Sequence, residues 1–291
     1  MQTHESRGSA MIRIIADSTC DLSPDELEAL DIETVPLTIM ISGKVYRDCI
    51  DITHDELYQR MRLAEEPITT SQVNPMEFEA AFAPHVQQGD EVVALTIGSG
   101  FSATYSSALA AAAMTDKTRV HVVDTGTGSF GAALLLREAA RLRDAGAHTA
   151  GQIADAIRAI APRVRLYGVV DTLKRLRLSG RLSGGAAMIG NLLGIKPLLR
   201  VQNGKLEPAG IARGDNGARK ALLRYFLDEK ADLSHGIAFA AADAKERLAA
   251  CVEAFRPYID KARIFTGSIG AAIGAHTGPG VIGVAWLVNQ G

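Results

Sequence analysis

Short apolar runs alternate with helix-like patterns along the first half of the chain. The runs at residues 11–16, 91–97 and 119–124 have the length and composition of buried strands, and polar or glycine-rich residues follow each of them. Helical patterns come between these runs, and two of them begin with N-cap signals at Ser23 and Thr53. This alternation predicts a mostly parallel sheet with helices on both faces. Helices are expected over 24–30, 53–64, 76–87, 104–114, 134–143 and 149–160, a further strand over 34–41, and a hydroxyl-rich loop over 67–75.

The second half of the chain does not show this regular alternation of strands and helices. Asn203-Gly204 separates two extended stretches, 197–202 and 205–212, and both turn residues tolerate a positive φ, so a β-hairpin is expected there. Residues 186–193 have the pattern of an apolar helix. The expected architecture is α/β, with an N-terminal domain over 11–161, an α+β domain over 162–291, and a flexible tail over 1–10. Other strands are expected at 166–170, 236–241, 263–266 and 281–288.

Composition excludes several classes of protein. Apolar residues make up 47% of the 291 residues and charged residues 22%, as in ordinary globular proteins. The net charge of −2 gives no general attraction to nucleic acid, so no nucleic-acid partner is expected. Three cysteines without a recognised ligand spacing predict neither a disulfide framework nor a metal site. No apolar run reaches the length of a membrane helix and the first ten residues are polar, so we expect a cytoplasmic protein without stable membrane insertion.

Polar clusters follow the predicted strands, where α/β sheets bind ligands. The loop from Gly98 to Ala103 matches G-x-G-x-x-A, and Asp124 ends the next strand, which is the spacing of a dinucleotide site. A second match begins at Gly126, and two matches in succession weaken both. The same loop also brings Ser99 and Ser102 to a helix N-terminus, which favours an anion. Ordinary helix capping by these hydroxyls remains an alternative.

Three further features of the sequence are candidates for ligand or partner binding. His276 is expected in a Gly/Pro loop, where an imidazole either donates to a carboxylate or phosphate or is a turn residue bonded to the local backbone. A basic run is either a solvated face or a docking site for an acidic partner; it consists of Lys174, Arg175, Arg177 and Arg181. Beside it is an aliphatic set that fits either core packing or a hydrocarbon pocket; it includes Met188, Ile189, Leu192 and Ile195.

Taken together, these segments resemble the DegV family of bacterial fatty-acid-binding proteins. The resemblance runs from Ile14 to Val288, and it rests on the order and spacing of motifs that are each weak alone. The motifs are Asp17-Ser18, Thr70-Ser71-Gln72, the segment from Ser99 to Tyr105, Val123-Asp124, Ser179-Gly180-Arg181, Lys196-Pro197 with Asn203-Gly204, and the segment from His276 to Gly280.

The resemblance implies two α/β domains with one long-chain fatty acid between them and no other cofactor. It implies that Thr70, Ser99, Ser102 and His276 hold the carboxylate. It also implies that a separate ATP-dependent fatty acid kinase phosphorylates the carboxyl group, and that the binding protein itself is not an enzyme. Arg181 and its basic neighbours would face the kinase or the phosphate, and Met188, Ile189, Leu192 and Ile195 would line the tunnel.

The chain departs from the family pattern at several of these positions. Gly98 stands where a first serine is usual, so either Ser99 or Ser102 must make the carboxylate contact, and the sequence does not decide between them. Because a salt bridge to an arginine would make the carboxylate a weaker nucleophile, we expect Arg181 near the tunnel mouth and not on the carboxylate. Separately, we expect a monomeric protein. The alternatives are an NAD(P)-dependent oxidoreductase that uses Gly98 to Ala103, and a lipid sensor or transporter without a kinase.

Overall fold

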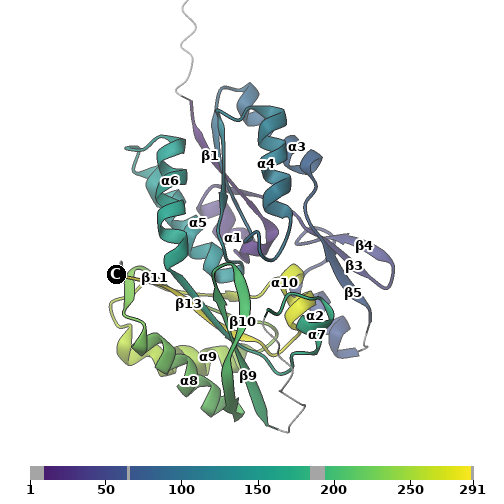
Figure 1. Ribbon diagram of the computed structural model, residues 1–291, viewed down its shortest axis with the longest axis vertical. Helices are drawn as coiled ribbons and strands as arrows, with labels where there is room; N and C mark the ends of the chain where they lie inside the picture. Colours follow the sequence, from purple (N-terminus) through teal and green to yellow (C-terminus); the bar gives the residue numbers. More distant parts are fainter. Residues whose placement is uncertain (1–9, 64–65, 184–193, 290–291) are drawn as a thin grey trace, which may run out of the picture.

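The computed structural model describes residues 10–63, 66–183 and 194–289, and Figure 1 shows their arrangement. A four-stranded parallel sheet has the order β2 (Ile32–Val35), β1 (Ile12–Asp17), β6 (Glu91–Thr96) and β7 (Val120–Asp124). All of the strands point the same way, so the loops that follow β1, β6 and β7 lie at one edge of the sheet. That edge faces the second half of the chain.

Helices cover both faces of this parallel sheet. Alternate residues of β6 point to opposite sides, so Val92 and Ala94 pack in one apolar cluster and Val93 and Leu95 in another. The predicted parallel sheet with helices on both faces is therefore confirmed. One face carries α3 (Pro75–Gln87) and α4 (Thr104–Thr115), the other carries α5 (Ser129–Asp144) and α6 (Ala150–Ile160), and α1 (Pro24–Ala29) lies beside β2.

A six-stranded mixed sheet forms most of the second half of the chain. Its strand order is β10 (Lys205–Arg213), β9 (Ile195–Gln202), β8 (Val164–Val169), β13 (Ile282–Val288), β11 (Ala231–Ala241) and β12 (Ile264–Ser268). On one face α8 (Gly214–Asp228) and α9 (Lys245–Phe255) enclose a core around Trp286. The opposite face packs on α5, so this helix contacts both large sheets. The predicted boundary at residue 161 falls in a short 3₁₀ turn, η2 (Ala161–Arg163), just before β8.

A small antiparallel sheet corrects two predictions. The stretch 34–41 is not one strand, because Pro36 separates β2 from β3 (Thr38–Ile41), and β3 belongs to a different sheet with β4 (Lys44–Arg47) and β5 (Ile68–Ser71). The predicted loop over 67–75 is also wrong in part, since β5 occupies its first half. Ser42 and Gly43, with φ of 48° and 83°, form the tight turn between β3 and β4. This sheet packs beside α2 (His54–Leu63) and α10 (Ala271–Thr277).

Other local predictions can be compared with the structure directly. The β9–β10 hairpin is confirmed, with Asn203 and Gly204 at φ of 51° and 69°. His276 is not in a loop as predicted, because it lies in the last turn of α10, which ends before Gly278. The predicted helix over 186–193 lies outside the described residues. Within the described ranges no helix is long and apolar enough to span a membrane.

Candidate functional site

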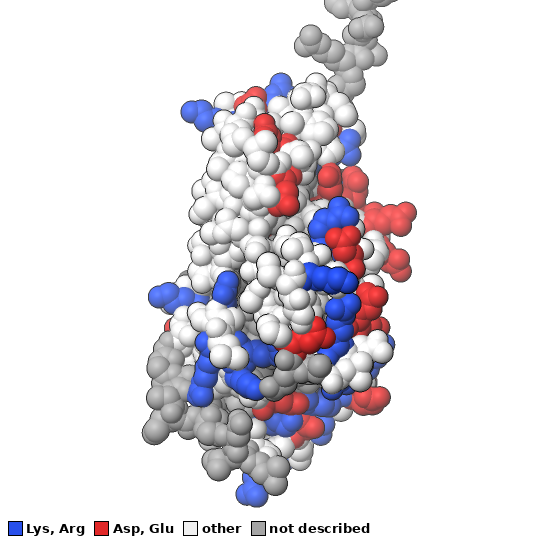
Figure 2. Space-filling model, turned by 90° about the vertical axis from the view of Figure 1, so that its right-hand side faces the viewer, with Lys and Arg blue, Asp and Glu red and all other residues white. Residues whose placement is uncertain are grey.

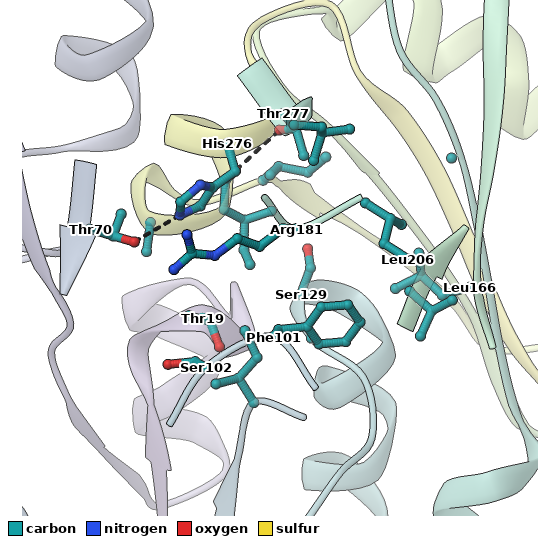
Figure 3. A pocket seen from close by; sticks show the side chains of 18 of the residues that line it. Thr19, Thr70, Phe101, Ser102, Ser129, Leu166, Arg181, Leu206, His276 and Thr277 are labelled. Carbon is teal, nitrogen blue, oxygen red and sulfur yellow. Dashed lines mark hydrogen bonds between the residues drawn. The ribbon is translucent and has the colours of Figure 1, made fainter. Parts of the chain in front are cut away.

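A cavity of about 630 Å³ lies between the parallel sheet and the six-stranded sheet. Loops at the edge of the parallel sheet form one wall, strands β8, β9 and β13 form another, and β5 and α10 close one end. The volume falls within the range of small-molecule sites. Its lining is polar at the end near β5 and α10 and aliphatic at the end near β8 and β10 (Figure 3).

The polar end is built on a hydrogen bond between distant elements. Thr70 on β5 and His276 on α10 are joined by an Oγ1···Nε2 contact of 2.7 Å (Figure 3). Thr70 reaches the cavity because β5 pairs with β3, and α10 packs against both strands. Two of the predicted carboxylate ligands are therefore neighbours.

Burial and a nearby cation keep His276 neutral. The pKa of His276 is lowered to about 4, first because the ring is buried and second because the Arg181 guanidinium is close. At neutral pH one ring nitrogen is therefore a hydrogen-bond donor and the other an acceptor. Arg181 was expected near the tunnel mouth, but its guanidinium lies in the cavity wall beside the His276 ring (Figure 3). Its Nη1 also donates to the Ser179 carbonyl, which fixes the end of the side chain.

The two candidate serines lie in the loop after β6 and differ in their surroundings. The Ser102 hydroxyl is half-buried, 2.9 Å from Thr104 Oγ1, and it accepts the Thr104 amide at the start of α4. Ser99 is exposed, and its amide donates to Asp124 Oδ1 at 3.0 Å. Both serines line the cavity, but Ser99 also lines a second cavity of about 1080 Å³.

The opposite end of the cavity is formed by aliphatic and aromatic side chains. Gly283 on β13 leaves room for Phe130, since a Cβ there would overlap the Phe130 ring. The absence of a side chain at this strand position therefore lets the ring lie against the sheet. The remaining apolar lining includes Leu166, Val170, Leu176, Leu199, Val201 and Leu206.

The basic residues of the predicted docking site are divided between cavity and surface. Lys174 and Arg177 are exposed and Arg175 is half-buried, all on the short helix α7 (Lys174–Leu178), whereas Arg181 lines the cavity. Helix α7 lies on the right in Figure 1, and Lys and Arg side chains gather in the lower half of that face in Figure 2.

The predicted tunnel residues are only partly placed. Met188, Ile189 and Leu192 lie outside the described residues. Ile195 begins β9 and is not among the described residues that line the cavity.

Sequence reasoning missed two polar groups of the cavity wall. Thr19 lies in the turn after β1, where its hydroxyl and amide both donate to the buried Asp17 carboxylate. Ser129 begins α5 with φ of 52°, and its hydroxyl donates to Asp21. Both residues could have been found from the sequence, because each follows a predicted strand of the parallel sheet, and α/β sheets bind ligands at that edge.

Comparison with known proteins identifies the family of this chain. A family model described as "Uncharacterised protein, DegV family" matches residues 11–289. The chain belongs to the DegV family. A DegV domain-containing protein of Deinococcus radiodurans is 36% identical over 280 residues, which cover 94% of this chain and 97% of the relative.

Solved DegV structures have the same fold. A DegV family protein from Thermus thermophilus, described by its fatty acid binding, superposes with a TM-score of 0.85 at 29% identity, covering 96% of this chain and 100% of that one. A stearic-acid-binding protein from Eubacterium ventriosum gives a TM-score of 0.84 at 27% identity, covering 96% of this chain and 98% of the other. The predicted α/β fold of the DegV type is confirmed by these matches.

Proposed function

We propose that this protein binds a long-chain fatty acid in the 630 Å³ cavity, with the carboxylate at the polar end. The observation that carries the proposal is one cavity with hydrogen-bonding groups at one end and aliphatic walls elsewhere. Each buried CH₂ of an acyl chain contributes about 0.8 kcal/mol. The names of the solved relatives, which include fatty acid and stearic acid binding, support the same ligand class.

The carboxylate is held by neutral donors with one cation nearby. The neutral His276 ring donates from Nε2 to Thr70 Oγ1, which leaves the Thr70 hydroxyl proton to donate to the carboxylate. The hydroxyl protons of Thr19 and Ser129, on the opposite wall, are already donated to Asp17 and Asp21. We assign the serine contact to Ser102, because Ser99 is exposed and lies at the boundary of the second cavity. A carboxylate in an apolar cavity requires such partners, since an unpaired buried charge is costly.

We further propose that the bound carboxyl group is presented to an ATP-dependent fatty acid kinase. The position of Arg181 supports this step, because a cation beside His276 favours the additional negative charge of an acyl phosphate. The exposed Lys174 and Arg177 and the half-buried Arg175 would dock an acidic surface of the kinase. In this proposal the protein is a monomeric, cytoplasmic, non-catalytic carrier.

One observation weighs against the dinucleotide alternative. The Asp124 carboxylate, which would have to bind a ribose, accepts the backbone amides of Ser99 and Gly126 through the same oxygen at 3.0 and 2.9 Å. It therefore ties the two glycine-rich loops to each other. A lipid sensor or transporter without a kinase shares the proposed ligand and is separated from the carrier only by the kinase assay.

Native mass spectrometry of the freshly purified protein tests the ligand. We expect a stoichiometric adduct of fatty-acid mass, and organic extraction identifies the chain. Thr70→Ala and His276→Ala should lose the adduct, whereas Thr149→Ala, which removes a hydroxyl outside the cavity, should keep it. A protein that stays free of lipid when fatty acid is added would contradict the proposal.

The kinase step has its own test. A triple substitution of Lys174, Arg175 and Arg177 by alanine should leave the fatty acid adduct intact and lower acyl phosphate formation by an acyl kinase at least about tenfold. If the fully loaded wild-type protein is not a substrate for any fatty acid kinase tested, the sensor or transporter reading replaces the carrier reading.

A further inference from the structure

A cluster of metal-ligand side chains lies outside the fatty acid cavity. Asp48, Cys49 and His54 each offer one ligand atom, and these atoms lie within 4.8 Å of one another. Asp48 and Cys49 follow β4, and His54 is the first residue of α2. None of the three is among the described residues that line the cavity. Nothing in the proposed binding of a fatty acid uses this cluster.

The two distances from Cys49 Sγ suit a tetrahedral metal ion. Cys49 Sγ lies 3.4 Å from His54 Nε2 and 3.8 Å from Asp48 Oδ1. Ligand atoms at normal zinc bond lengths and a tetrahedral angle are about 3.6 Å apart. Thiolate, imidazole and carboxylate together are the donor set of a borderline-soft divalent ion.

The backbone conformation of Cys49 supports its role as a metal ligand. Its φ is 63°, a left-handed conformation in which a side chain with a Cβ is disfavoured. This conformation brings the Cys49 thiol toward both Asp48 and His54, and the residue is exposed to solvent. Strained backbone of this kind is found where the surroundings hold a residue in place for a function.

Two buried carboxyl groups belong to the cluster or lie beside it. Asp48 is buried, with Oδ2 held by the Ser18 hydroxyl at 2.7 Å, which leaves Oδ1 facing Cys49. Asp21 is a second buried carboxylate nearby: its Oδ1 has no hydrogen-bond partner of good geometry, and both this oxygen and His54 Nε2 lie against Gly270. Among the described residues, no Lys or Arg forms an ion pair with Asp21 or Asp48. A divalent cation would stabilise the carboxylate form of Asp48.

We propose that Asp48, Cys49 and His54 bind a divalent transition-metal ion of the zinc type, with water as the fourth ligand. Binding forms a bond from the metal to Cys49 Sγ and releases the thiol proton to solvent. The sequence did not predict this site, because a cysteine and a histidine five positions apart match no standard zinc spacing. Asp48 joins them only through the turn at Cys49.

Titration with Co²⁺ under anaerobic conditions tests the site, using the whole protein after treatment with a chelator. The wild type should develop a thiolate-to-cobalt charge-transfer band that saturates at one equivalent and is displaced by Zn²⁺. Cys49→Gly should lose the band and weaken binding by more than about 100-fold. His54→Ala should also weaken binding.

The choice of glycine separates loss of metal from loss of fold. Glycine adopts φ of 63° without strain, so Cys49→Gly should melt at the same temperature as the metal-free wild type or higher. Cys251→Ala is the matched control, since it removes a buried thiol in another part of the molecule and should keep the band. A wild type without the charge-transfer band, or a Cys49→Gly variant that binds Co²⁺ as tightly, would overturn the proposal.

Discussion

His276 couples the polar end of the cavity to pH. The folded protein holds its pKa at about 4, against an ordinary value of 6.5, because the ring is buried and close to Arg181. Between these values the unfolded chain binds more protons, so the free energy of unfolding falls as the pH is lowered from 6.5 to 4. The contribution of the neutral His276 ring to the free energy of unfolding is fully present above pH 6.5. Below pH 4 the protein has lost about 3 kcal/mol of this free energy.

Urea unfolding of the wild type and of His276→Gln at pH 7 and pH 5 measures this contribution. Glutamine keeps a side-chain donor near Thr70 but does not titrate, so the variant should lose less stability than the wild type over this interval. Comparing the two proteins cancels the titration of other groups. Identical losses would mean that His276 ionises as freely in the folded protein as in the unfolded chain.

Helix α10 carries His276, and its position depends on a close approach at Gly274. A Cβ at Gly274 would overlap the phenol of Tyr58 on α2, whose hydroxyl donates to the Ile269 carbonyl at 2.8 Å. We expect Gly274→Ala to destabilise the protein by about 1–3 kcal/mol and to displace α10. Fatty acid binding should weaken although Gly274 is not among the described lining residues of the cavity.

A double substitution distinguishes displacement of α10 from general destabilisation. Tyr58→Phe removes the nearest atom of the overlap and should restore part of the fatty acid affinity when it is combined with Gly274→Ala. The affinities follow from a fluorescent fatty acid titration, and the stabilities from urea unfolding. Equal affinity for Gly274→Ala and the wild type would show that α10 is not displaced.

Elements with local signals could be predicted from the sequence, and those set by distant contacts could not. The capping residue Thr149 and the turn Asn203-Gly204 are recognisable from their neighbours alone. The antiparallel sheet was missed because β3 pairs with β5, nearly thirty residues away, and the apolar pattern runs on through Pro36. Thr70 and His276 are 206 positions apart, so only the family resemblance placed them in one site.

The whole molecule encloses its cavity by bringing two separate turns together. The loop after β6 meets the tip of the β9–β10 hairpin at Gly100 and Gly204, so close that a Cβ at Gly100 would overlap the Gly204 carbonyl oxygen. Val201 and Leu206, on either side of that hairpin turn, line the aliphatic end of the cavity. Gly100 lines both this cavity and the second one of about 1080 Å³, so the contact between the two glycines lies between the two cavities.

Gly100→Ala should therefore open the aliphatic end. Since both atoms that would collide are fixed to backbone, the loop and the hairpin must move apart and admit solvent to the acyl chain. We expect a bound fluorescent fatty acid to dissociate at least about tenfold faster, which corresponds to a barrier to dissociation lower by about 1.4 kcal/mol. Gly151→Ala is the matched control, because a Cβ at that position in α6 meets His121 only at an ordinary distance of 3.5 Å. Stopped-flow displacement measures both variants, and an unchanged dissociation rate for Gly100→Ala would mean that the aliphatic end is closed by other residues.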